Sequence, residues 1–134
     1  TLILAGLMWF TLFVIPFLKY PANPPTVGES ETVVLRGILY ITLIVISGLM
    51  AIGFYQIFKR LKNKNRVLAI IGYAILMSIV FFMMPDNPDK ISTSMELVNG
   101  FRAVAFLTGT VFWFTLALFL GMFWQKTNPD LSNT

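Results

Sequence analysis

Four stretches of the chain contain no Asp, Glu, Lys or Arg and are mostly apolar: 2–18, 37–58, 67–84 and 103–125. A helix needs about 20 such residues to cross the hydrocarbon core of a bilayer. Apolar residues run continuously here instead of alternating with polar ones, which argues against the strands of a β-barrel. We therefore expect an all-α integral membrane protein with four transmembrane helices, and a single domain over residues 1–134.

Segment 19–25, with the sequence KYPANPP, interrupts the apolar pattern after the first stretch. Proline fixes its own φ, lacks a backbone N–H and disfavours the α conformation of the residue before it. The segment is therefore predicted to be a stiff, extended loop. It is either a helix stop or a surface for a partner, for which the candidate docking residues are Lys19, Tyr20, Pro21, Asn23, Pro24 and Pro25.

Pro16 lies inside the first apolar stretch, close to its end. Its missing N–H leaves a backbone carbonyl without its helical partner. Membrane helices tolerate such a position where a neighbouring helix supplies another donor. We expect a kink at this point.

Segment 59–66 carries five positive charges and no negative one, which is typical of a short cytoplasmic loop. Alternation then places loops 19–36 and 85–102 outside the cell and both chain ends in the cytoplasm. The acidic residues agree with this orientation, because five of them fall in the two outer loops: Glu29, Glu31, Asp86, Asp89 and Glu96. The chain thus reads as two helical hairpins in the plasma membrane.

The two outer loops share a short pattern, PANP at 21–24 and PDNP at 85–88. Each loop is followed by an arginine, Arg36 or Arg102, at the start of the next apolar stretch. This pattern predicts a parallel repeat of two hairpins. A match of four residues also arises by chance in proline-rich loops, so this alternative stays open.

Small residues in the last apolar stretch are separated by four or eight positions: Ala105, Gly109, Ala117 and Gly121. Such spacing allows helices to approach closely. It fits packing within the bundle better than a face between two copies of the chain.

Composition narrows the chemistry further. The chain is 57% hydrophobic and 12% charged, and it contains no Cys and no His. Disulfides, thiolate chemistry and zinc or haem sites with His ligands are therefore excluded. Phosphate-binding glycine loops, nucleophile triads and nucleic-acid motifs are also absent. We expect no enzyme activity, no bound cofactor and no nucleic-acid partner, and the bilayer is the first partner. The apolar stretches lack ionisable groups, which argues against a self-sufficient proton-driven pump.

Oxygen ligands gather in the predicted outer loops. Carboxylate, carbonyl and water oxygens suit hard divalent cations, and the candidate metal-binding residues are Glu29, Glu31, Asp86 and Asn23. The alternative is structural: loops in water are polar in any case, and Arg36 and Arg102 can pair with these carboxylates at the membrane boundary.

The segment PFLKYPANPP at 16–25, with Val27-Gly28, Glu31-Thr32, Arg36 and Leu39-Tyr40 after it, resembles the signature of the cobalt transporter subunit family CbtA. Pro85-Asp86 and Phe101-Arg102 are similar to the family's C-terminal region, whereas segment 88–96 departs from it. The resemblance implies Co²⁺ as the transported ion, further apolar sequence before the motif, and a small single-span partner, CbtB, that carries histidines. This chain would then be the C-terminal portion of a family member.

Two hypotheses follow. In the first, the chain is a membrane subunit of a cobalt uptake system, with outer loops that collect the cation and a His-bearing partner. In the second, it is a non-catalytic accessory subunit of a larger membrane enzyme complex, which docks through segment 19–25.

Overall fold

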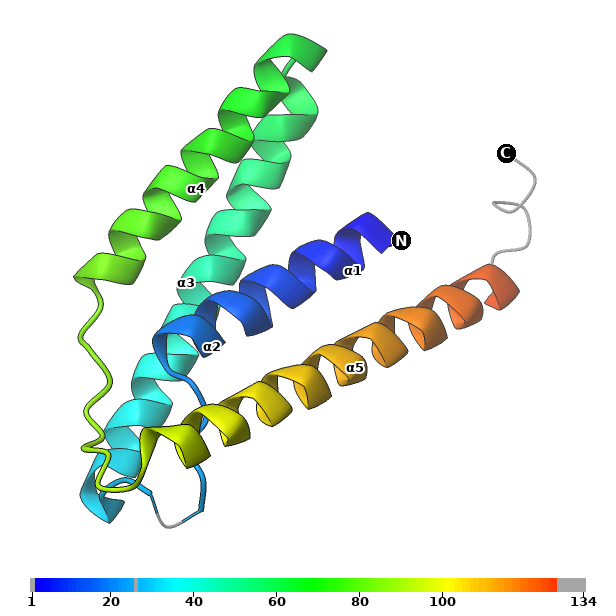
Figure 1. Cartoon of the computed structure of the whole chain (residues 1–134). Coiled ribbons are helices and arrows are strands. Elements are labelled where there is room, and N and C mark those ends of the chain that lie inside the picture. Colours follow the sequence, from blue (N-terminus) through cyan, green and yellow to red (C-terminus); the bar gives the residue numbers. More distant parts are fainter. Residues whose placement is uncertain (1, 26, 128–134) are drawn as a thin grey trace.

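The computed structural model of the chain, which describes residues 2–25 and 27–127, consists of helices and loops (Figure 1). No strand occurs among these residues, so the all-α prediction is confirmed. The N-terminal segment comprises α1 (Leu2–Trp9), a π-helix (Phe10–Val14) and α2 (Ile15–Lys19). The long helices are α3 (Val33–Arg60), α4 (Arg66–Met83) and α5 (Met95–Thr127), and short 3₁₀ turns at Ser30–Thr32 and Asn63–Asn65 precede α3 and α4.

Three helices, and not the four we expected, are long and apolar enough to cross a membrane: Ser30–Arg60, Asn63–Met83 and Met95–Thr127. The apolar helix Leu4–Lys19 is shorter. At 1.5 Å per residue it measures ~24 Å, less than the roughly 30 Å of a hydrocarbon core. The four-span prediction is therefore corrected: among the described residues three helices reach spanning length, and the N-terminal helix does not. The prediction that both chain ends lie in the cytoplasm concerns terminal residues outside the described ones.

Two of the long helices begin earlier than their apolar stretches. Helix α3 begins at Val33 and α5 at Met95, whereas the apolar pattern begins at 37 and 103. Arg36 and Arg102 therefore lie on helices and not in loops. A charged residue ends an apolar stretch, but it has ample helix propensity and leaves the backbone hydrogen bonds intact.

The π-helix explains how the first segment tolerates Pro16. In this register the N–H of Ile15 donates to the carbonyl of Phe10, five residues back. The next such bond would run from residue 16 to the Thr11 carbonyl, and proline has no N–H to donate. Ser47 of α3, which is fully buried, supplies the missing donor, with its Oγ 2.6 Å from the Thr11 carbonyl oxygen. A neighbouring helix thus satisfies the carbonyl that Pro16 leaves without a helical donor.

The end of α2 and the beginnings of α3 and α5 meet at one end of the molecule, from which α5 diverges from α3, while α4 lies beside the C-terminal part of α3 (Figure 1). Helices α3 and α4 pack as an antiparallel pair, while the N-terminal segment contacts α3 and α5. The buried cluster lies near the meeting point and contains Ile15, Tyr20, Leu43 and Met77. Most apolar side chains of the long helices face outward, as lipid-facing residues do: none of the most apolar window of α5 is buried.

The π-helix also packs against α5 through Phe13. Its ring lies on Gly109, where an added Cβ would come within 2.3 Å of the Phe13 ring. Phe13 stacks on Phe106, with ring centroids 5.6 Å apart. The glycine thus provides space for an aromatic ring within the bundle, whereas Gly121 of the same stripe has nothing near it.

Candidate functional site

The loops 20–29 and 84–94 come together at the end where the helices meet, and residues in contact there are 65 or 66 positions apart in sequence. Lys19 Nζ lies 2.9 Å from Asp86 Oδ1, and the Tyr20 hydroxyl donates to the Pro85 carbonyl at 2.6 Å. Tyr20 is only 2% exposed. The KYPANPP loop is therefore fixed against the second loop and does not extend freely into solvent.

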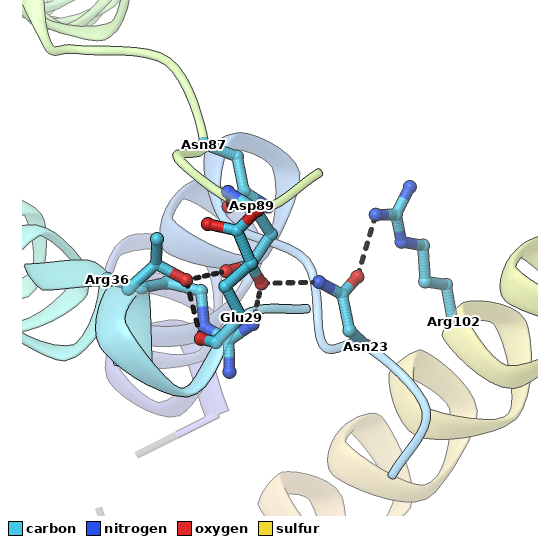
Figure 2. A network of polar contacts seen from close by, with 7 residues as sticks. Asn23, Glu29, Arg36, Asn87, Asp89 and Arg102 are labelled. Carbon is cyan, nitrogen blue, oxygen red and sulfur yellow. Dashed lines mark hydrogen bonds and ion pairs between the residues drawn. The ribbon is translucent and has the colours of Figure 1, made fainter. Parts of the chain in front are cut away.

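The Asp89 carboxylate is the centre of the polar contacts between the loops (Figure 2). The Asn23 side-chain amide donates to Oδ2 at 2.6 Å, and Thr32 Oγ1 lies 2.6 Å from Oδ1. The guanidinium of Arg36, on the first full turn of α3, forms an ion pair with the same carboxylate. The Asp89 side chain is 1% exposed, so this carboxylate is a buried anion with a complete set of donors.

Local backbone chemistry brings Asp89 to this position. Its own N–H donates to Asn87 Oδ1 at 3.1 Å, a turn that an Asn side chain commonly forms two residues before the donor. On the opposite side, Gly28 has φ of 105°, and an added Cβ would lie 3.0 Å from Asp89 Oδ2. Glycine adopts this conformation without strain, and its lack of a side chain leaves room for the carboxylate.

The environment lowers the pKa of Asp89. Burial alone acts in the opposite direction, because it disfavours the charged form. The hydrogen bond from Thr32, the positive charge of Arg36 and the hydrogen bond from Asn23 together outweigh it. Asp89 is therefore an ionised carboxylate at neutral pH.

Arg102, on the second turn of α5, extends the same set of contacts. Its Nη2 donates to Asn23 Oδ1 at 2.9 Å, while its buried Nε has no partner among the described residues. Each arginine thus reaches the loop of the other predicted hairpin: Arg36 contacts Asp89, and Arg102 contacts Asn23. Of the two, Arg36 pairs with a carboxylate and Arg102 with an amide.

The four residues predicted to bind a metal do not converge on one point. Glu29 and Glu31 are exposed, and their carboxylates have no ion pair with the described residues. Asp86 is 98% exposed beside Lys19. The Asn23 amide is held between Asp89 and Arg102. In the described part of the chain, no three His, Cys, Asp or Glu side chains are grouped so as to hold a metal ion.

The candidate docking residues are divided between contacts inside the molecule and the surface. Lys19, whose side chain is 9% exposed, lies over the ring of Phe81, 5.3 Å from its centroid. Pro21 and Pro24 are half-buried and Pro25 is exposed. A partner could contact Pro25 and its surroundings, whereas Lys19 and Tyr20 already face the second loop.

Sequence reasoning did not identify Asp89 as the central residue. Asp89 is one of the predicted outer carboxylates but not one of the candidate metal ligands, because segment 88–96 departs from the pattern of the family that the chain resembles. The Asn87-Pro88-Asp89 sequence carried a signal, since Asn two residues before a loop residue favours such a turn. Gly28 and Thr32 belong to the sequence signature by which the chain resembles the family, and both lie against the Asp89 carboxylate.

Comparison with known protein families identifies a match. The sequence model of the family described as "Probable cobalt transporter subunit (CbtA)" matches residues 1–125, nearly the whole chain. No curated protein and no solved structure matches the chain.

Proposed function

The chain belongs to the CbtA family, and from this premise we propose that it is the membrane subunit of a Co²⁺ uptake system whose joined loops collect the cation. The observation that carries the proposal is that the loops 20–29 and 84–94 form one polar surface with exposed carboxylates. Glu29 and Asp86 are exposed in these loops and Glu31 is exposed in the adjoining 3₁₀ turn, while the buried Asp89 carboxylate joins the two loops. The basic segment 59–66 at the other end supports an orientation with this surface outside the plasma membrane.

Single carboxylates suit a collecting surface better than a storage site. Carboxylate oxygens attract a hydrated divalent cation, and a site without three converging ligands releases it readily. A transport path requires binding that is strong enough for entry and weak enough for exit. Exposed, separate carboxylates meet that requirement.

Transfer of Co²⁺ across the membrane requires metal ligands within the bilayer that this chain lacks. It has no His and no Cys, and the apolar cores of its long helices contain no ionisable residue. The family resemblance supports a small His-bearing single-span partner, whose imidazoles would provide ligands within the membrane. In this proposal the chain shapes the route and the partner supplies the nitrogen ligands.

The collecting role is tested by neutralising single carboxylates. We expect Glu29→Gln and Asp86→Asn each to lower the initial rate of radioactive cobalt uptake by about twofold or more, because surface charge raises the encounter rate of an opposite charge. Lys90→Gln is the matched control, since it alters one exposed charge of opposite sign in the same loop. Uptake that is unchanged in both acidic variants, at equal protein levels, would remove the loops from the proposal.

The alternative is a non-catalytic accessory subunit of a larger membrane complex. The absence of ionisable groups in the apolar cores favours it, because an accessory helix needs none. Isolation of the native assembly separates the two. A large assembly with enzymatic subunits supports the accessory role, whereas a small assembly with a His-bearing partner and bound cobalt supports transport.

A further inference from the structure

An apolar groove lies between α1 and the α3–α4 pair, towards the end opposite the joined loops. Its volume is about 330 Å³, within the range of small-molecule sites in proteins. Its walls are aliphatic and aromatic, and they include Leu7, Ala51, Phe54, Tyr55, Phe58 and Tyr73. By shape and chemistry, the groove fits a hydrocarbon chain.

Two basic side chains lie over aromatic rings that line the groove. The Lys59 ammonium lies 4.7 Å from the ring centroid of Tyr55, and the Arg66 guanidinium lies 5.1 Å from that of Phe58. Both belong to segment 59–66, with five positive charges and no negative one. The groove is thus bordered by positive charge along one end.

These cations have no protein counter-charge among the described residues. The acidic residues that the structure describes all belong to the joined loops, to the 3₁₀ turn at Ser30–Thr32 or to the first turn of α5: Glu29, Glu31, Asp86, Asp89 and Glu96. Neither ion pair of the described chain involves segment 59–66. An anionic group therefore fits this end of the groove.

We propose that this groove binds one anionic phospholipid. Its phosphate lies beside Lys59 and Arg66, and an acyl chain occupies the aromatic groove. This occupant satisfies both observations together, the apolar walls and the positive charge at one end. Arg66 already donates through Nε to the Leu61 carbonyl at 3.3 Å, but a carbonyl carries no net charge, and a purely apolar partner helix leaves both cations without a counter-charge.

The test is native mass spectrometry of the purified chain in mild detergent, with phosphatidylglycerol or phosphatidylcholine of identical acyl chains added. We expect the wild type to bind phosphatidylglycerol about tenfold more tightly or better, given the attraction of each basic residue for anionic lipid. Equal affinity for the two lipids overturns the proposal, and so does a second protein chain found in the groove in place of lipid.

Variants separate the headgroup contact from the acyl contact. Lys59→Gln combined with Arg66→Gln is expected to reduce phosphatidylglycerol affinity to the level of phosphatidylcholine, while Lys90→Gln at the opposite end changes nothing. Ala51→Phe fills the groove and is expected to weaken both lipids, whereas Ala103→Phe on exposed α5 weakens neither. Loss of the lipid preference in the Lys90 variant, or full binding in the Ala51 variant, contradicts the assigned location.

Discussion

Asp86 and Asp89 are three residues apart in one loop, and the fold gives them different roles. The Asp86 side chain is 98% exposed and has one contact, with Lys19, whereas Asp89 is 1% exposed and contacts Asn23, Thr32 and Arg36. An exposed ion pair contributes little to stability, because water and salt screen it. A buried carboxylate with several donors contributes more, because its removal leaves a cation unpaired. We therefore assign Asp86 to the collecting surface and Asp89 to its support.

The substitution Asp89→Asn tests this division. It removes the charge that pairs with Arg36 and weakens the hydrogen bonds from Asn23 and Thr32, so we expect a loss of about 2–3 kcal/mol in unfolding free energy. Thermal unfolding in detergent measures the effect. Asp86→Asn is the matched control and is expected to leave the unfolding temperature within error. Equal destabilisation by both substitutions would contradict the central position of Asp89.

The lowered pKa of Asp89 gives stability a defined pH dependence. Its folded-state pKa lies below the ordinary value of 3.8. This group therefore contributes stability that is fully present above the unfolded-state pKa and is lost as the pH falls through the folded-state pKa. Below about pH 4, the unfolding temperature of the wild type should fall more steeply than that of Asp89→Asn. Parallel curves for the two proteins would exclude this contribution.

At the scale of elements, α3 supplies a hydrogen-bond donor that the N-terminal helix lacks. Pro16 removes one donor from the first helix, and Ser47 of α3 supplies another to the Thr11 carbonyl. The Thr11 carbonyl that accepts this hydrogen bond belongs to the π-helix Phe10–Val14. Local π-type geometry commonly accommodates a proline within membrane helices.

Ser47→Ala removes the substitute donor. We expect a loss of about 1 kcal/mol, the size of polar contacts between membrane helices, measured by unfolding in detergent. Ser78→Ala serves as the control, because Ser78 is exposed and its hydroxyl donates only to Ala74 of its own helix. If both alanine variants unfold like the wild type, the Thr11 carbonyl does not depend on Ser47.

Contact between the π-helix and α5 depends on the missing side chain of Gly109. An alanine Cβ at this position would overlap the Phe13 ring, so Gly109→Ala is expected to cost about 1–3 kcal/mol through overpacking. Gly121→Ala, on the same helix with open space around it, should cost nothing. Unfolding measurements on both variants decide this, and a neutral Gly109→Ala would show that Phe13 repacks freely.

The apolar pattern predicted the helices well and their ends poorly. It located α4 to within a residue, because charged segment 59–66 and Pro85 lie directly beside the helix. It missed the first turns of α3 and α5, whose polar residues remain helical. The role of Asp89 could not be read from the sequence, because its partners Asn23 and Arg36 are 66 and 53 positions away. Such contacts become visible only when the two loops are placed together.

At the scale of the whole molecule, helix pairing matches the predicted repeat only in part. The repeat relates the α3–α4 pair to the α5–α1 pair, and both pairs are in contact. It also relates the packing of the N-terminal segment on α3 to packing of α4 on α5, and no comparable contact between α4 and α5 occurs among the described residues. The reciprocal reach of Arg36 and Arg102 agrees with the repeat. The repeat itself stays a prediction. Its consequence is that both loops lie at one end, which makes a shared collecting surface possible (Figure 1).

Cobalt accumulation in the native cell tests the central claim most directly. The metal content of cells with and without the intact gene is compared at limiting external Co²⁺, with manganese and zinc measured in the same samples. We predict that loss of the gene lowers cellular cobalt, that re-expression restores it, and that manganese and zinc stay unchanged. Equal cobalt content with and without the gene would contradict a role in cobalt uptake.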